Sequence, residues 1–453
     1  MERRYTSSTL AAATEQPRPL GILAAGGPLP IELAEAGNRS GRPIHIVAID
    51  GFAGGAVERF PHERVSVGQV GRMISSFKRA GVTEIVIAGA MQRPNLVGLR
   101  IDWGFVSNLP TVLALTRGGD DSVLRRVVRF FESHEFKVIG ASDVAPDLLA
   151  PPGLMTRRGP SAENEMALAR AAALIADLGQ FDIGQGIVAG PNGIVAVEGL
   201  RGTDAMLADL GPGGTAEGRG RGGVLVKLAK PGQEMRIDLP TIGPETVRGA
   251  AAAGMAGIAV GARGAIVLER QRVVEAADQE GLFVTGIEAS VGDFDTNDAR
   301  VSAPYGAATE SVLPVVARRA PTPGQRRDIA MARQALAVLR RHQGGHAVLV
   351  SREHVLAVTG ASTLAEFVSA QGRTRTWGRR LLGQKRGVLV VDGAAAAGKA
   401  ESILDVALFS AARDVSLAGI VVLAPLSEGE QREQCRAWAN EAGVFLMCPA
   451  DVP

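Results

Sequence analysis

The chain has 453 residues, of which 46% are apolar and only 4% aromatic, and its net charge is +2. This length exceeds what one hydrophobic core serves and predicts two or three domains, whereas the small net charge argues against a nucleic-acid-binding protein. The 57 glycines predict many tight turns at strand ends, as in α/β proteins, and two cysteines without a CxxC spacing indicate a reducing compartment.

The chain begins with a polar segment that lacks the apolar stretch of a signal peptide. We therefore expect residues 1–18 to be a disordered tail. Beyond it, short apolar runs alternate with helical patterns; strands are predicted at residues 43–50, 84–89 and 137–140, and helices at 66–81 and 122–134. This alternation predicts a Rossmann-like α/β domain over residues 19–155.

A second α/β domain is predicted over residues 160–288. It opens with a helix at 162–178 that Ser161 is placed to cap. Strands are then expected at 186–188, 194–197, 224–226, 257–260 and 282–284, with helices near 246–253 and 272–280. Residues 211–223 are rich enough in glycine to predict a mobile loop, and residues 289–324 read as a linker.

The remaining residues, 325–453, repeat the second domain. Four short apolar segments recur in the same order, each displaced by 161 to 164 residues; the pairs begin at 194 and 355, 223 and 387, 256 and 418, and 280 and 442. One shared spacing predicts a duplicated domain. The polar positions are replaced, for example Glu198 by Thr359 and Lys227 by Val391. We therefore expect a degenerate, non-catalytic repeat.

The middle of the chain carries the side chains suited to a phosphate ester and a divalent cation. Asp238 precedes Leu-Pro at an extended position, and Pro244 then begins a helix. A carboxylate beside a helix N-terminus can bind Mg²⁺ while the helix faces phosphate, although an ordinary turn aspartate gives the same local pattern. Lys227 ends a predicted strand and offers a positive charge.

Further polar groups follow neighbouring predicted strands. Glu198, Thr203 and Asp204 add oxygen atoms after the strand at 194–197. In the first domain, Gly26 and Gly27 follow an apolar strand and can bring backbone N–H groups to a phosphate. The chain lacks a GxGxxG fingerprint and a GxxxxGK[ST] motif, which disfavours a dinucleotide dehydrogenase or a P-loop NTPase.

Taken in order, these motifs resemble the LpxI family of UDP-2,3-diacylglucosamine pyrophosphatases. The resemblance runs over residues 20–287 and includes Gly68-Gln-Val-Gly71, Ala88-Gly89, Gly119-Asp-Asp121, Val197-Glu-Gly-Leu-Arg-Gly-Thr-Asp204 and Arg236-Ile-Asp-Leu-Pro-Thr-Ile-Gly243. Two positions depart from the family pattern: Arg201 stands where a glutamate is usual, and Gln233-Glu-Met-Arg236 stands for Gln-Asp-x-Arg. The extension beyond residue 290 lies outside the pattern.

The resemblance implies hydrolysis of UDP-2,3-diacylglucosamine to UMP and 2,3-diacylglucosamine 1-phosphate in lipid A biosynthesis, with Mg²⁺ or another divalent cation. It implies catalytic roles for Asp238, Lys227 and Asp204, with Asp238 and Asp204 as metal ligands. Substrate contacts are expected from Gly26, Gly27, Gln69, Gly89, Asp102, Gln185 and Thr203. We expect a cytoplasmic homodimer that can contact the inner membrane peripherally.

Two alternatives remain at this point. A dinuclear metallophosphoesterase could perform the same step, but none of the six histidines lies in a DxH or GNHD motif. A non-catalytic protein that binds nucleotide sugars or glycolipids would keep the glycine loops without turnover. The retention of Asp238, Lys227 and Asp204 favours the enzyme.

Overall fold

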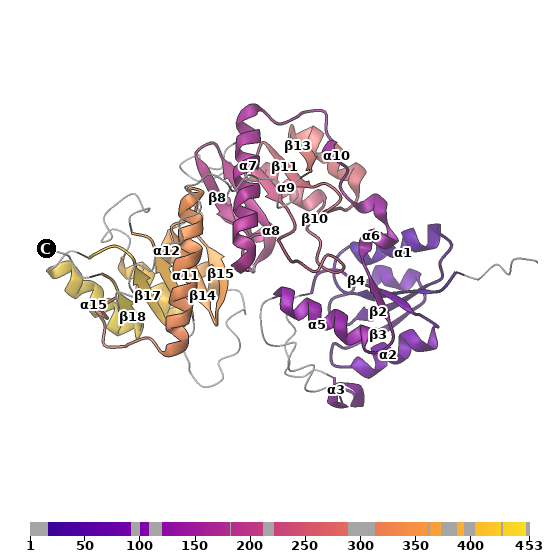
Figure 1. Ribbon diagram of the computed structural model, residues 1–453, viewed down its shortest axis with the longest axis horizontal. Helices are drawn as coiled ribbons and strands as arrows, with labels where there is room; N and C mark the ends of the chain where they lie inside the picture. Colours follow the sequence, from indigo (N-terminus) through magenta and orange to yellow (C-terminus); the bar gives the residue numbers. More distant parts are fainter. Residues whose placement is uncertain are drawn as a thin grey trace, which may run out of the picture. The chain divides into compact units, whose positions relative to one another are not determined.

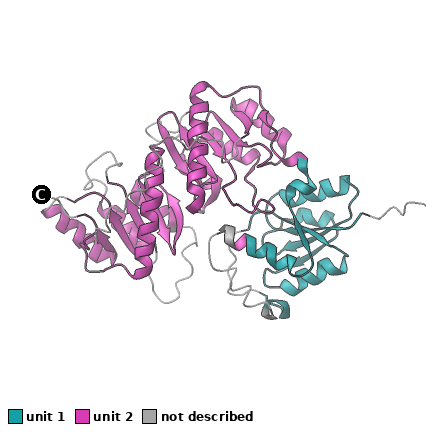
Figure 2. Ribbon diagram, in the orientation of Figure 1, with its two compact units in different colours: residues 1–117, 125–146 teal, residues 118–124, 147–453 magenta. Residues whose placement is uncertain are grey.

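The computed structural model describes residues 17–91, 100–107, 120–181, 183–211, 222–288, 313–359, 363–372, 387–393, 404–426 and 429–449. It is a mixed α/β protein with several sheets (Figure 1), as the alternating pattern predicted. The chain divides into two compact units, residues 1–117 with 125–146 and residues 118–124 with 147–453 (Figure 2). No helix among the described residues is long and apolar enough to cross a membrane. Most of the predicted tail, the 211–223 loop and the 289–324 linker lies outside the described residues.

The first unit is built on a five-stranded parallel sheet in the order β3-β2-β1-β4-β5. Its elements are β1 (Leu20–Ala24), α1 (Leu29–Arg39), β2 (Ile44–Ile49), β3 (His62–Val65), α2 (Val70–Arg79), β4 (Glu84–Ala88), α3 (Trp103–Ser107), α5 (Asp120–Glu132), β5 (Lys137–Ile139) and α6 (Ala141–Val144). The chain runs outward from β1 to β3 and then returns to the other side of β1. This reversal leaves the carboxyl ends of β1 and β4 side by side, where α/β sheets commonly bind ligands.

The second unit begins with a six-stranded sheet in the order β6-β13-β11-β9-β7-β8. We call residues 153–287 the middle segment. Its elements are β6 (Gly153–Leu154), α7 (Ala162–Leu178), β7 (Gly186–Gly190), β8 (Gly193–Val197), α8 (Gly202–Leu210), β9 (Val224–Lys227), β10 (Thr241–Ile242), α9 (Pro244–Ala252), β11 (Gly257–Gly261), β12 (Ile266–Val267), α10 (Arg270–Glu280) and β13 (Phe283–Ile287). Strands β9, β11 and β13 are parallel, whereas β7 runs antiparallel to β9 and to β8.

A second sheet of five strands follows, in the order β15-β14-β16-β17-β18. We call residues 313–449 the C-terminal segment. Its elements are α11 (Pro323–Arg341), β14 (Ala347–Ser351), β15 (His354–Val358), α12 (Leu364–Gly372), β16 (Val388–Val391), α14 (Val406–Asp414), β17 (Gly419–Val422), α15 (Glu430–Ala442) and β18 (Phe445–Met447). Taken in this order, the five strands have the same relative directions as β8, β7, β9, β11 and β13 of the middle segment.

The two segments also agree in strand register. The β7–β8 hairpin pairs Ile187 with Val197, and the β14–β15 hairpin pairs Val348 with Val358, each 161 residues later. Both hairpins carry a register shift at the equivalent place. Both α7 and α11 begin with a capping box, and the two cap residues, Ser161 and Thr322, are also 161 positions apart. Part of the predicted linker, residues 313–324, belongs to the C-terminal segment: α11 begins at Pro323, and the N–H of Val316 donates to the Leu446 carbonyl on β18.

Each of these sheets is buried on both faces because its strands are apolar at successive positions. In β9, Val224 and Val226 enter one hydrophobic core, while Leu225 enters another, which α8, α9 and α10 cover. The core that holds Val224 is shared: it includes α7 from the middle segment and α11 with Val348 from the C-terminal segment. The outer face of the C-terminal sheet packs under α12, α14 and α15.

Candidate functional site

Polar side chains of the middle segment gather at one edge of its sheet. Strand β7 runs antiparallel to both β8 and β9, so its first residues lie beside the last residues of those strands. Gly186 at the start of β7 pairs with Lys227 at the end of β9, and the backbone N–H of Glu198 donates to the Gly186 carbonyl over 2.7 Å. Sequence positions up to 41 residues apart are thereby joined at one place.

Lys227 is the centre of this cluster. Its side chain is only 6% exposed, and its Nζ donates to Thr203 Oγ1 at 2.6 Å and to the Thr241 carbonyl at 3.3 Å. Thr203 donates in turn to Glu198 Oε1 over 3.0 Å. The lysine is therefore fixed from three directions, by the loop after β8, by α8 and by β10.

Glu198 contributes the most unusual group in the cluster. It is 9% exposed, and its Oε2 lies 3.9 Å from Lys227 Nζ without a hydrogen-bond partner among the described residues. Gly186 makes room for this oxygen, because a Cβ at that position would stand 2.2 Å from it. A buried polar atom without a partner is rare in native proteins, and a catalytic role or a bound water or ion is among its explanations.

Asp238 is held beside this cluster by a glutamine. Gln233 is buried, and its Nε2 donates to Asp238 Oδ2 at 2.7 Å, to the Asp238 carbonyl at 2.6 Å and to Gln185 Oε1 at 3.0 Å. Gln185 directly precedes Gly186, and its carbonyl accepts from the N–H of Leu228 over 3.0 Å. Asp238 is itself partly exposed and can reach solvent or a ligand.

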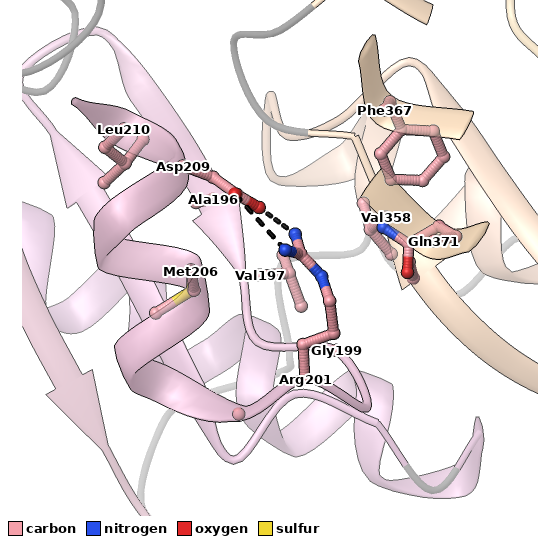
Figure 3. A pocket seen from close by; sticks show the side chains of 12 residues that line it. Ala196, Val197, Gly199, Arg201, Met206, Asp209, Leu210, Val358, Phe367 and Gln371 are labelled. Carbon is pink, nitrogen blue, oxygen red and sulfur yellow. Dashed lines mark hydrogen bonds and ion pairs between the residues drawn. The ribbon is translucent and has the colours of Figure 1, made fainter. Parts of the chain in front are cut away.

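Two further predicted positions lie nearby with different surroundings. Asp204 is exposed on the first turn of α8, and no hydrogen bond or ion pair joins it to Lys227 in the part of the chain that the structure describes. Arg201, where the family pattern has a glutamate, forms an ion pair with Asp209 on the same helix. Its guanidinium therefore points along α8, as Figure 3 shows.

In the first unit, the predicted glycines meet where β1 and β4 end. The backbones of Gly26 and Ala90 exchange two hydrogen bonds of 2.9 Å. Gly89 has φ of +99°, and a Cβ there would lie 2.5 Å from the Gly26 carbonyl oxygen, so a side chain is excluded. Gly27 has φ of +89° with open space around it. This turn is well shaped for a close approach of a ligand to the backbone.

The other two predicted residues of that unit lie in turns that follow β3 and precede α3. Gln69 accepts the Ser66 N–H through Oε1 at 2.9 Å. Asp102 accepts the backbone N–H groups of Arg72 and Phe105, both at 2.8 Å. These bonds give Asp102 a role in joining α2 to α3. The described contacts do not link Gln69 or Asp102 to Gly26 or Gly89.

The C-terminal segment has different chemistry at the equivalent positions. Thr359 stands for Glu198 and is 2% exposed; its hydroxyl accepts from the N–H of Ala347 at 3.0 Å. Val391 stands for Lys227 and is fully buried. In the middle segment Gly186 lies against the Glu198 carboxylate, whereas in this segment the equivalent residue, Ala347, lies against Thr359. The described part of this edge thus lacks equivalents of Lys227 and Glu198, and its buried carboxylate is Asp392, which forms an ion pair with Arg340 of α11.

The arrangement of Asp238 is compatible with a cation that takes most of its ligands from a substrate. The described residues contain no group of three or more His, Cys, Asp or Glu side chains arranged to hold a metal ion. Mg²⁺ is commonly bound by one or two carboxylates together with substrate phosphates. Asp238, partly exposed and oriented by Gln233, fits that description.

Sequence reasoning did not select two residues of this cluster as site residues. The sequence predicts Glu198 only as a source of oxygen atoms, because the pattern does not reveal that its side chain is buried beside Lys227. In the sequence Gln233 is only part of a motif, and no local signal shows that its amide orients Asp238. In both cases the informative partner lies on another strand or loop.

In the first unit, glycine turns at strand ends are typical of α/β proteins that bind phosphorylated ligands. In the second unit, the buried Lys227 and the partly exposed Asp238 are suited to the same class of ligand. Two family models match this chain: residues 19–148 match the LpxI N-terminal domain and residues 151–285 the LpxI C-terminal domain. The UDP-2,3-diacylglucosamine pyrophosphatase LpxI of Caulobacter vibrioides is 38% identical over 274 residues, which are 60% of this chain and 98% of that protein. The chain belongs to the LpxI family, as its motifs predicted.

Proposed function

We propose that the protein hydrolyses UDP-2,3-diacylglucosamine to UMP and 2,3-diacylglucosamine 1-phosphate. Membership in the LpxI family makes the chain a hydrolase that acts on a diphosphate bond in the lipid A pathway. The observation that carries the proposal is the buried Lys227, held by Thr203 and Thr241 at the same edge as the oriented Asp238. A fixed cation beside a carboxylate is suited to a diphosphate whose charge increases as it is cleaved.

In this proposal each residue has a distinct task. Lys227 binds a phosphate oxygen and stabilises the charge that develops on it, because its position is set by hydrogen bonds before substrate arrives. Asp238 orients the water that attacks the UMP-side phosphorus and accepts its proton, with Gln233 fixing the carboxylate. Thr203 and the exposed Asp204 face phosphate from the start of α8. Glu198 keeps Lys227 and Thr203 in place.

We propose Mg²⁺ or another divalent cation as the cofactor, with Asp238 and Asp204 as the residues that would hold it. A bound cation would neutralise negative charge on the diphosphate. In the first unit, we propose that the turn of Gly26, Gly27 and Gly89 binds the nucleotide part, together with Gln69 and Asp102.

The first test replaces the central carboxylate. We expect Asp238→Ala to lower UMP release more than tenfold, a loss above about 1.4 kcal/mol of barrier stabilisation, with substrate binding by calorimetry retained. Asp414→Ala is a matched control, since Asp414 is 72% exposed on α14 and forms its ion pair with the neighbouring Arg413. A rate within tenfold of wild type for Asp238→Ala would remove this residue from its central role. Absence of UMP release by the wild-type protein would favour the non-catalytic glycolipid-binding alternative.

Two finer features of the fold belong to this proposal. We propose that the first unit is a Rossmann-like domain, supported by its parallel sheet with order β3-β2-β1-β4-β5. We also propose that the C-terminal segment is a degenerate, non-catalytic copy of the middle segment. Shared strand order, shared register and the loss of Glu198 and Lys227 equivalents support this view.

We propose in addition a cytoplasmic enzyme that contacts the inner membrane peripherally to reach its lipid substrate. Trp103 is 81% exposed and Ile101 is 55% exposed, next to Arg100. Exposed tryptophan beside a basic residue is well suited to the boundary of an anionic bilayer. A homodimer also remains our expectation for the full chain.

A further inference from the structure

The middle and C-terminal segments contact each other through equivalent elements. Helix α7 packs against α11, and β8 lies beside β15. The helical residues that enter the shared core are spaced by 161 positions: Leu168 and Ile329, Ala171 and Ala332, Ile175 and Leu336, Leu178 and Leu339. In a two-fold symmetric dimer, both partners contribute the same surface to the interface.

A small cavity lies between the two segments and shows the same symmetry. It has a volume of about 60 Å³. Its walls contain four pairs of residues that are 161 positions apart: Ala196 and Ala357, Val197 and Val358, Met206 and Phe367, Leu210 and Gln371. Figure 3 shows the members of these pairs on opposite sides of the space, with Met206 and Leu210 on α8 and Phe367 and Gln371 on the C-terminal segment. A pseudo-two-fold axis therefore passes through the cavity.

Backbone contacts tie the C-terminal segment to the turn that carries the site. The N–H of Leu200 donates to the Leu356 carbonyl on β15 over 3.2 Å. Gly199, between Glu198 and Leu200, is so close to that carbonyl that a Cβ would lie 2.9 Å from it. The turn between Glu198 and Thr203 thus rests directly on β15.

A second contact fixes the start of β8. The N–H of Ile194 donates to the Gln343 carbonyl over 3.4 Å, and a Cβ on Gly344 would stand 2.7 Å from Ile194 Cβ. Beside it, His342 Nε2 lies 2.8 Å from Asp177 Oδ2 on α7. Arg341 Nη2 also lies 3.7 Å from Asp177 Oδ2. The two segments are therefore joined by apolar packing, by backbone hydrogen bonds and by the contacts of Asp177 with His342 and Arg341.

We propose that the C-terminal segment is a built-in partner of the middle segment. It covers the face formed by α7 and β8, which a second copy of the middle segment would otherwise cover across the pseudo-two-fold axis. It also positions the turn that carries Glu198 and Thr203. The inference rests on the proposed duplication. A segment without the site residues is retained because its shape completes the interface. A homodimer of the full chain consequently uses a face other than α7 and β8.

The test uses the full chain with Gly344→Val, which places a side chain against Ile194. Hydrogen exchange is measured at the amides of Ile194 and Leu200, together with molar mass by light scattering over a range of concentrations. Gly324→Val is the matched control, because the nearest atom to a Cβ there is 3.9 Å away, at the end of the Arg327 side chain. We expect both amides to exchange at least about tenfold faster in Gly344→Val than in the control. We also expect the exposed face to cause new, concentration-dependent self-association.

Activity gives a separate readout of positioning. In Gly344→Val we expect kcat for UMP release to fall while KM changes little, since the turn that holds Lys227 loosens. Unchanged exchange at Ile194 and Leu200 would overturn the proposed interface, whether or not the protein hydrolyses the substrate. Faster exchange with unchanged kcat in an active enzyme would overturn the positioning role. If Gly344→Val does not fold, His342→Ala is used, and unaltered exchange at Ile194 then overturns the proposal.

Discussion

The buried pair of Lys227 and Glu198 allows a quantitative prediction about stability. Lys227→Met keeps most of the side-chain volume and removes the charge. At 3.9 Å, two unit charges attract by about 4 kcal/mol with an effective dielectric constant of 20. Removing one partner of a buried pair leaves the other charge uncompensated, so we expect Lys227→Met to lower the free energy of unfolding of the second unit by about 3–5 kcal/mol.

A matched control separates burial from distance. Lys137 Nζ lies only 2.9 Å from Glu84 Oε1, closer than in the buried pair, but the Lys137 side chain is 71% exposed. Solvent screens this pair, so Lys137→Met should cost at most about 1 kcal/mol. The double variant Lys227→Met with Glu198→Gln removes both buried charges. It should recover most of the lost free energy of unfolding, because no unpaired charge is left in the interior.

Native-state hydrogen exchange is the appropriate assay, because the two compact units need not unfold together. Amides of β7 and β11, which pair with β9, report on the second unit, and amides of β1 report on the first. Equal losses for Lys227→Met and Lys137→Met would refute the reasoning from burial. So would a double variant less stable than Lys227→Met alone.

Three further predictions follow from other contacts. Gly186→Ala places a Cβ against Glu198 Oε2, so we expect about 1–3 kcal/mol of destabilisation in urea unfolding together with loss of UMP release; unchanged values would contradict the described fit. The hydrogen bond from His342 holds the pKa of Asp177 below its ordinary value near 3.8. The pair therefore contributes to the free energy of unfolding above that pH, and this contribution is lost as the pH falls through the lower pKa of the folded state. The stability difference between wild type and Asp177→Asn should therefore shrink below about pH 4, and a difference that grows there would be inconsistent with this pair. Trp103→Ala should weaken binding to vesicles containing anionic lipid, measured by co-sedimentation, and equal binding would exclude a membrane role for this residue.

Much of the local structure was predictable from the order of residues. Short apolar runs that end in glycine predicted the strands, and the structure has β2 at Ile44–Ile49 where residues 43–50 were expected. Pro244 begins α9 as expected for a proline in the first turn. The repeated spacing was also visible, because it depends only on matching positions along the chain. These features are set by neighbours in sequence, so sequence carries them directly.

The environment of the candidate site was decided by the tertiary structure. Glu198 gains its character from Gly186 and Lys227, which strand pairing brings next to it from elsewhere in the chain. Asp238 is oriented by Gln233 through an amide contact that no periodicity encodes. The packing of α7 on α11 likewise depends on two sheets whose inner faces close one core. Burial and electrostatic strength are properties of such assembled surroundings, and they exist only once distant segments have come together.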